Sequence, residues 1–167
     1  MEGEAALVDE EVTAVVLAVI VVVGVFAVAQ PFYANRIVDP FSELAVLGPN
    51  KKIGDYPKTL AAGEKFNLYV YVGNHEGWSN YYKVYAKLGN RTSIVNENVS
   101  LAVAPMAQYE VILRNNQTWL QSATFQIDVP GINHRLVFEI WRYKPEENAF
   151  VYDHKWVQLW LNVTGPD

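Results

Sequence analysis

Three histidines, each close to a carboxylate or a turn, are the residues of this sequence best suited to chemistry. His75 precedes Glu76, His154 follows Asp153, and His134 comes after a Pro-Gly turn. Loops at one end of a β-sandwich can gather such residues into a His–carboxylate metal site. No two of the histidines share a strand or a helix, so no spacing supports metal ligation. We therefore expect exposed turn histidines and no bound metal.

Motifs for catalysis are also missing. Cysteine is absent, which excludes thiol nucleophiles, disulfides and thiolate metal sites. The sequence has no Gly-x-Ser-x-Gly elbow and no glycine-rich phosphate loop. Glu139 lies beside Arg135 and Arg142, which predicts a cross-strand ion pair more simply than a glycosidase acid. We expect a non-catalytic protein without a cofactor, and a surface hydrolase is an alternative that no motif supports.

The charge of the chain is concentrated at its N-terminus. The net charge is −5, and residues 1–11 hold five acidic side chains and no Lys or Arg. Elsewhere the acidic residues balance the 13 Lys and Arg. A balanced body gives no steering toward phosphate, so a nucleic-acid partner is not expected. The sequence thus predicts an acidic tail over residues 1–11.

An uncharged apolar run from Val12 to Ala29 follows this tail. As a helix, 18 residues span about 27 Å, which is close to the thickness of the hydrocarbon core of a bilayer. The run is apolar on all sides, so a small soluble domain could hardly cover it. We predict a transmembrane helix over 12–30, in contact with lipid through Val12–Ala29, and a linker over 31–40. A cleaved signal peptide is an alternative, although the acidic N-terminus argues against it.

Four Asn-x-Ser/Thr sequons, which mark surface loops of exported proteins, all lie after this run. They begin at Asn90, Asn98, Asn116 and Asn162. The basic residues Arg36, Lys51 and Lys52 also follow the run, and their bias would place the body in the cytoplasm. We weigh the sequons more heavily and predict a single-pass membrane protein with an extracellular, N-glycosylated C-terminal domain.

From residue 41 onward, short alternating segments are separated by turn residues about every ten positions. This spacing predicts an all-β domain over 41–167, an immunoglobulin-like antiparallel β-sandwich of about eight or nine strands after one transmembrane helix. Residues 115–122 are expected to form a helical turn or a loop. The expected strands are 43–47, 66–72, 81–88, 100–103, 107–113, 123–129, 134–143, 149–152 and 155–163.

The last strands are rich in aromatic residues on alternating positions. Alternation places Trp156 with Trp160 on one face of a strand, and Trp141 with Tyr143 on one face of another. The simplest interpretation is a sandwich core with cross-strand aromatic pairs. Two alternatives are an exposed aromatic binding face for sugars and a surface covered by a partner subunit.

A more specific pattern lies between residues 41 and 77. Its elements occur in a fixed order: Glu43 before Gly48-Pro49, then Tyr56-Pro57, Gly63-Glu64 and Asn74-His75-Glu76. This stretch resembles the archaeal "domain of unknown function 1616" family. The resemblance implies a membrane-anchored protein with an outward-facing β-sandwich and no established activity. Physically these residues suit structural roles, since Gly63 permits a turn with positive φ and Asn74 can cap the following turn.

Together these features predict a cell-surface β-sandwich that binds envelope proteins or glycans or acts as a structural subunit. Protein partners or self-assembly at the surface are expected. One alternative is a subunit of an extracellular pilus-like filament with the apolar helix in its core, although residues 1–11 lack the basic residue of a pilin leader. Another is an accessory subunit of a membrane enzyme complex, with the helix packed on partner helices.

Overall fold

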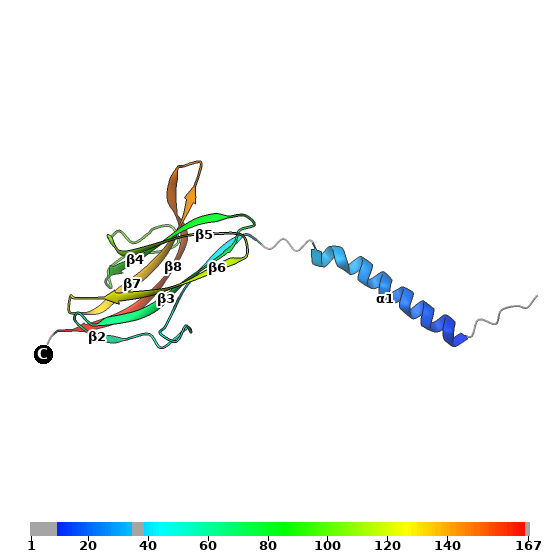
Figure 1. Ribbon diagram of the computed structural model, residues 1–167, viewed down its shortest axis with the longest axis horizontal. Helices are drawn as coiled ribbons and strands as arrows, with labels where there is room; N and C mark the ends of the chain where they lie inside the picture. Colours follow the sequence, from blue (N-terminus) through cyan, green and yellow to red (C-terminus); the bar gives the residue numbers. More distant parts are fainter. Residues whose placement is uncertain (1–9, 35–38, 166–167) are drawn as a thin grey trace, which may run out of the picture. The chain divides into compact units, whose positions relative to one another are not determined.

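The computed structural model describes residues 10–34 and 39–165. The chain divides between Asp39 and Pro40 into a helical unit and a β unit (Figure 1). Each unit is described by itself. The predicted acidic tail falls mostly on residues 1–9, outside the described residues.

The helical unit is one long helix, α1 (Glu10–Ala34), and it contains the predicted transmembrane segment. The window Val12–Gln30 is long and apolar enough to cross a membrane, and none of it is buried within the protein. The helix continues beyond the predicted boundary, so residues 31–34 of the expected linker are helical. Pro31 falls in the last turn, where its missing N–H removes a single helical hydrogen bond. Residues 35–38 of that linker lie outside the described residues.

The β unit is a sandwich of two sheets, as predicted. Every neighbouring pair is antiparallel except β2 and β8, which run parallel. The smaller sheet has the order β1 (Phe41–Leu47), β3 (Lys65–His75) and β6 (Gln117–Gln126). The larger sheet has the order β2 (Thr59–Ala61), β8 (Ala149–Thr164), β7 (Gly131–Lys144), β4 (Asn80–Gly89) and β5 (Pro105–Leu113).

The core lies between the inner faces of the two sheets and follows the alternation of the sequence. Leu68 and Val70 of β3 are fully buried, and they belong to the same cluster as Phe138 and Ile140 of β7. Phe138 meets Phe125 of β6 edge-on, with ring centroids 5.5 Å apart. Burying each such side chain stabilises the fold by about 1.5–3 kcal/mol before entropy is counted.

Three strand predictions were wrong in detail. β6 already begins at Gln117, where a helical turn or loop was expected, because the segment pairs along its whole length with β3. Residues 100–103 form no strand. β8 is one strand where two were predicted, because a bulge opposite Ile140 and Trp141 absorbs Asp153 and His154. His154 has a φ of 58°, which lets the strand continue past the bulge.

Residues 90–104 run over the outer face of the larger sheet and are held there by a buried ion pair. Lys87 Nζ lies 2.8 Å from the Glu139 carboxylate, and the same ammonium donates to the carbonyl of Leu101. The backbone N–H of Leu101 donates to Glu139 in turn. The expected pairing of Glu139 with Arg135 or Arg142 was therefore wrong. Arg142 faces the other side of β7, and Arg135 donates instead to the Gln158 side chain and to the carbonyl of Ser93.

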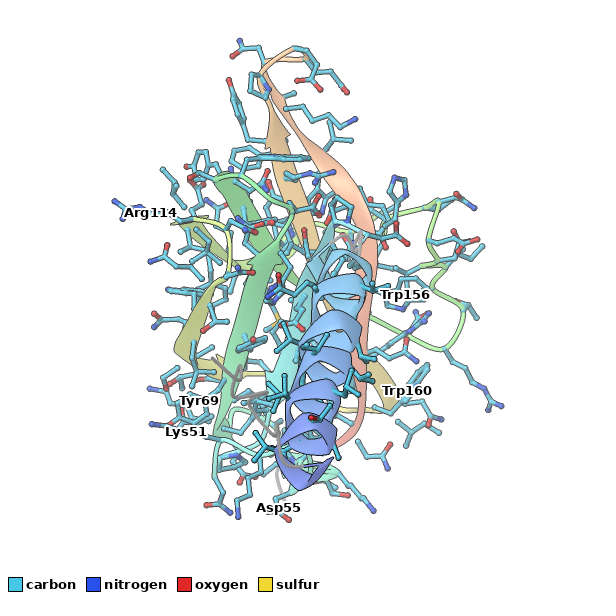
Figure 2. All side chains as sticks on the ribbon, turned by 90° about the vertical axis from the view of Figure 1, so that its right-hand side faces the viewer. Lys51, Asp55, Tyr69, Arg114, Trp156 and Trp160 are labelled. Carbon is cyan, nitrogen blue, oxygen red and sulfur yellow. The ribbon has the colours of Figure 1, made fainter. Side chains whose placement is uncertain are left out.

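The four predicted aromatic residues lie on this outer face. Trp141 packs edge-on against Tyr85, and Tyr143 packs against Phe150. Trp156 lies against a small buried cluster of Val95, Leu101 and Val137 beneath residues 90–104. Figure 2 shows Trp156 and Trp160 projecting from β8 on the side away from Tyr69. Trp160 is 43% exposed, and the other three are half-buried.

Candidate functional site

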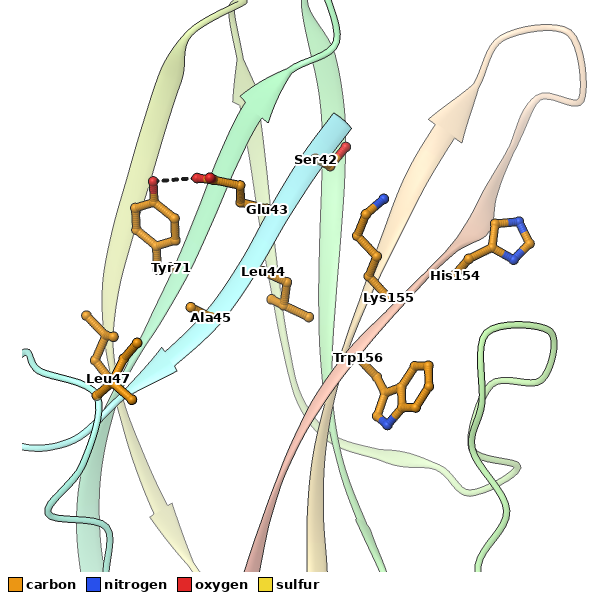
Figure 3. Close-up of a pocket in the computed structure, with 10 residues that line it drawn as sticks. Ser42, Glu43, Leu44, Ala45, Leu47, Tyr71, His154, Lys155 and Trp156 are labelled. Carbon is orange, nitrogen blue, oxygen red and sulfur yellow. Dashed lines mark hydrogen bonds between the residues drawn. The ribbon is translucent and has the colours of Figure 1, made fainter. Parts of the chain in front are cut away.

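A groove between β1 and β8 is a concave site on the sandwich (Figure 3). Its volume is about 780 Å³. β1 contributes one wall and β8 the other, and Ile53 from the loop after β1 completes the rim. The lining residues are Ser42, Glu43, Leu44, Ala45, Leu47, Ile53, Tyr71, His154, Lys155 and Trp156.

The two walls are strand edges without strand partners. β1 pairs with β3 alone, and β2 covers only residues 162–164 of β8. The carbonyl of Asn74 accepts the N–H of Asn116 on the β6 side. The backbone N–H and C=O groups of even-numbered residues of β3 therefore bond β6, and those of odd-numbered residues bond β1. Ser42 and Leu44, which lie opposite even-numbered residues, therefore direct their N–H and C=O groups away from β3.

Val46 and Asn162 mark where each free edge ends. The carbonyl of Val46 accepts the hydroxyl of Tyr56 at 2.7 Å, which agrees with the outward direction of the even-numbered residues. On β8, the N–H of Asn162 donates to the carbonyl of Lys58. The backbone N–H and C=O groups of Trp156 and Gln158, which have the same parity, therefore also point away from β7. Within residues 39–165, the outward backbone groups of Ser42, Leu44, Trp156 and Gln158 have no hydrogen-bond partner.

Glu43 is the anchor of a polar cluster beside the groove. It accepts the Tyr71 hydroxyl at 2.8 Å, and its carboxylate lies 3.5 Å from His75 Nε2. Burial and then the hydrogen bond to Glu43 raise the pKa of Tyr71. Gly73 leaves room for this carboxylate, since a Cβ at that position would lie 2.5 Å from Glu43 Oε2. The cluster fixes the end of β1 on β3.

A buried polar network closes the sandwich beneath this end. The Tyr82 hydroxyl donates to Asn74 at 3.0 Å and lies 2.9 Å from the Ser42 hydroxyl, which donates to Glu76 at 2.8 Å. Arg142 bridges Glu76 and Asp153, the latter from the β8 bulge. Burial raises the pKa of Tyr82 to about 12. The network links β1, β3, β4, β7 and β8, so it positions both walls of the groove.

The remaining motif residues hold turns, as expected from their chemistry. Gly63 has a φ of 80°, and the carboxylate of Glu64 accepts the N–H of Ala61 at 2.8 Å. Gly48 passes so close to Gly54 that a Cβ would overlap the Gly54 carbonyl. Asn74 caps the next turn by accepting the N–H of Glu76. Pro49 follows Gly48, and Pro57 precedes β2. The motif thus builds the β1–β3 end and its loops.

The three histidines lie at separate places. His75 stands beside Glu43, His154 lies 2.6 Å from the carbonyl of Glu97, and His134 lies at the opposite end of β7. No group of three or more His, Asp or Glu within residues 10–34 and 39–165 is arranged to hold a metal ion.

All four sequon asparagines are exposed. Asn90 and Asn98 lie in the segment over the larger sheet, Asn116 lies in the turn between β5 and β6, and Asn162 lies within β8. Their glycosylation stays a prediction.

The comparisons with known proteins identify the family. Residues 37–162 match the family described as "Domain of unknown function (DUF1616)", and the chain belongs to it. This confirms the resemblance inferred from residues 41–77. A search of curated proteins finds no match.

Solved structures show the same sandwich at low identity. The crystal structure of the CARDB domain of the PF1109 protein from Pyrococcus furiosus, in complex with di-metal ions, is 15% identical with a TM-score of 0.50, and covers 77% of this chain and 96% of that one. The solution structure of that domain is 14% identical with a TM-score of 0.50, covering 75% and 96%. A β-glucosidase from Listeria innocua in complex with glucose is 14% identical with a TM-score of 0.46, covering 75% and 16%. At these identities the likeness to the two CARDB structures shows the fold alone.

Proposed function

We propose that this protein is a single-pass cell-surface protein whose sandwich binds an extended segment of another envelope protein in the β1–β8 groove. The observation that carries the proposal is the pair of unpartnered strand edges that line one groove. The apolar helix α1 is compatible with a membrane anchor. Four exposed sequons on the sandwich support an extracellular position.

The proposed mode of binding is addition of a strand to β1. Ser42 and Leu44 each offer one N–H and one C=O toward the groove, and an extended peptide satisfies such groups by backbone pairing. Its alternate side chains would fill the space lined by Leu44, Leu47 and Trp156. We therefore expect a segment that is apolar at every second position. The proposal is non-catalytic, because backbone pairing and apolar contact suffice for it.

A pair of substitutions at Leu44 tests this mode. Leu44→Pro removes the outward N–H, and proline is tolerated on an edge strand where the N–H does not serve the ladder. Leu44→Ala removes the same side chain but keeps the N–H, so it is the matched control. Thermal unfolding of both variants verifies that the sandwich forms.

The assay is cross-linking of native membranes followed by gentle detergent extraction and mass spectrometry. We expect a stoichiometric envelope protein, linked to residues of the groove, with the native chain and with Leu44→Ala, and at least tenfold less with Leu44→Pro. Equal recovery with both variants would refute strand addition. A partner lost only on substitution of Gly24 in α1 would favour the accessory-subunit alternative, and filaments in surface fractions would favour the pilus-like one.

A further inference from the structure

We propose that Asn162 carries an N-linked oligosaccharide whose first sugar packs on the indole ring of Trp160. The inference rests on the proposed extracellular position, because only an exported domain meets the glycosylation machinery. It deepens that proposal by selecting one acceptor and the side chain that receives the sugar.

Trp160 and Asn162 share one face of β8. Side chains alternate along a strand, and the intervening Leu161 is buried in the core, as is Val163 after the asparagine. Two residues along a strand correspond to about 6.6 Å, so a sugar bonded to Asn162 lies beside the indole. Trp160 is 43% exposed, so part of its indole is open to contact by such a sugar.

The side chain of Asn162 is oriented for this purpose. Its Oδ1 accepts the backbone N–H of Asn133 at 2.9 Å. Its Nδ2, the atom that would carry the sugar, has no hydrogen-bond partner within residues 39–165. Asn133 in turn lines a hollow of about 370 Å³ together with Arg91 and Trp160. The anchored oxygen thus ties the acceptor side chain to Asn133, a residue that lines this hollow.

The hollow has the chemistry that a sugar needs. The C–H face of a pyranose packs on an aromatic ring, and its hydroxyl groups bond polar side chains. Trp160 supplies the ring, and Arg91 and Asn133 supply polar groups. Arg135 lies 5.5 Å from the centre of the indole and is held by Gln158 and by the carbonyl of Ser93. This cation–π contact steadies the ring and leaves its exposed remainder for the sugar.

The other three sequons lack this arrangement. The residue two positions before the asparagine is Leu88 for Asn90, Asn96 for Asn98 and Arg114 for Asn116. Asn162 alone among the four has an aromatic residue at that position.

The modification is a transfer from a lipid-phosphate-linked oligosaccharide. The Asn162 amide nitrogen attacks the anomeric carbon of the donor, and the N–C bond forms as the bond from that carbon to the phosphate oxygen breaks. The lipid phosphate leaves with the bonding electron pair, and the nitrogen loses one proton to a base of the transferase.

The test compares the full chain made in its native host with the chain made in a host that lacks N-glycosylation. Each is prepared with Trp160 and as Trp160→Ser. We expect glycosylation to raise the Tm of the Trp160 protein by about 3 °C more than that of the Trp160→Ser protein. Trp78→Ser is the control, because Trp78 is also exposed but lies at the other end of the sheet, and it should leave the gain unchanged.

Two further variants assign the effect to one glycan. Thr164→Ala removes the Asn162 sequon without changing the asparagine, and it should abolish the difference between the Trp160 protein and its Trp160→Ser variant. Thr92→Ala removes the Asn90 sequon beside Arg91 and should preserve that difference. A rise in Tm on glycosylation that is equal for the Trp160 protein and the Trp160→Ser variant would overturn the proposed packing.

Glycopeptide mass spectrometry of the native protein separates this inference from the proposed function. A bare Asn162 with another sequon occupied would overturn the inference and leave the extracellular position standing. Four bare sequons would overturn the extracellular position as well.

Discussion

The Lys87–Glu139 ion pair offers the sharpest test of how residues 90–104 are held on the larger sheet. The charged atoms are 2.8 Å apart, and the two side chains are 7% and 0% exposed. Lys87→Met keeps an unbranched apolar chain but removes the ammonium. Glu139 is then left as a buried carboxylate without a cation, and Leu101 loses the donor to its carbonyl. Breaking a buried pair from one side costs about 3–5 kcal/mol.

The assay is thermal unfolding of the full chain in mild detergent, monitored by tryptophan fluorescence. For a sandwich of this size the loss corresponds to a fall in Tm on the order of 10–20 °C. Trp156 packs beneath residues 90–104 and Trp141 donates to Glu139, so both report the environment that changes. Limited proteolysis should also cut within residues 90–104 of the variant before any other part of the sandwich.

Two controls make the result decisive. Adding Glu139→Leu to Lys87→Met removes the orphaned charge and should recover most of the lost stability. Lys144→Met removes the exposed pair with Glu147 and should cost less than about 0.5 kcal/mol. A loss below about 1 kcal/mol for Lys87→Met would refute the reasoning that this pair holds the segment.

Two further predictions concern the end of the sandwich near the groove. Gly73→Ala places a methyl group 2.5 Å from Glu43 Oε2, so we expect a loss of about 1–3 kcal/mol by thermal unfolding, much of it relieved by adding Glu43→Ala. Burial raises the pKa of Tyr82 from 10 to about 12, so the folded state holds this proton more tightly than the unfolded state. Its contribution to stability is complete below pH 10 and is lost as the pH rises toward 12. Denaturant midpoints across this range should fall less steeply for Tyr82→Phe; part of the slope should remain, since burial raises the pKa of Tyr152 to about 12 also. An unchanged slope would contradict this assignment.

Much of the fold could be predicted because alternation and turn residues are local signals. The segment 66–72 alternates strictly and became the centre of β3, and Gly63 adopted the positive φ expected of it. The long apolar run is also a local signal, and it forms helix α1 as predicted. The family pattern over residues 41–77 was equally local and identified the family correctly.

The groove and the ion pair could not be predicted because they depend on which strands become neighbours. Lys87 and Glu139 are 52 residues apart in the sequence, and their ion pair forms only because β4 pairs with β7. β2 has three residues and pairs in parallel with β8, which no periodicity reveals. The free edge of β8 exists because β2 stops after these three residues. Sequence patterns therefore singled out Glu43, His154 and Trp156 among the lining residues, but not the groove that they help to form.

The central place of β8 has a consequence for the timing of folding. β8 is the last strand of the sandwich, yet it lies inside the larger sheet, between β2 and β7. Until it emerges during synthesis, β7 has an open edge and β2 has no partner. The larger sheet therefore cannot form stepwise from the N-terminus. During synthesis the domain has unpaired strands, which are prone to aggregation. The same delay leaves Asn162 in an open chain until the final pairing, when a transferase could still reach it.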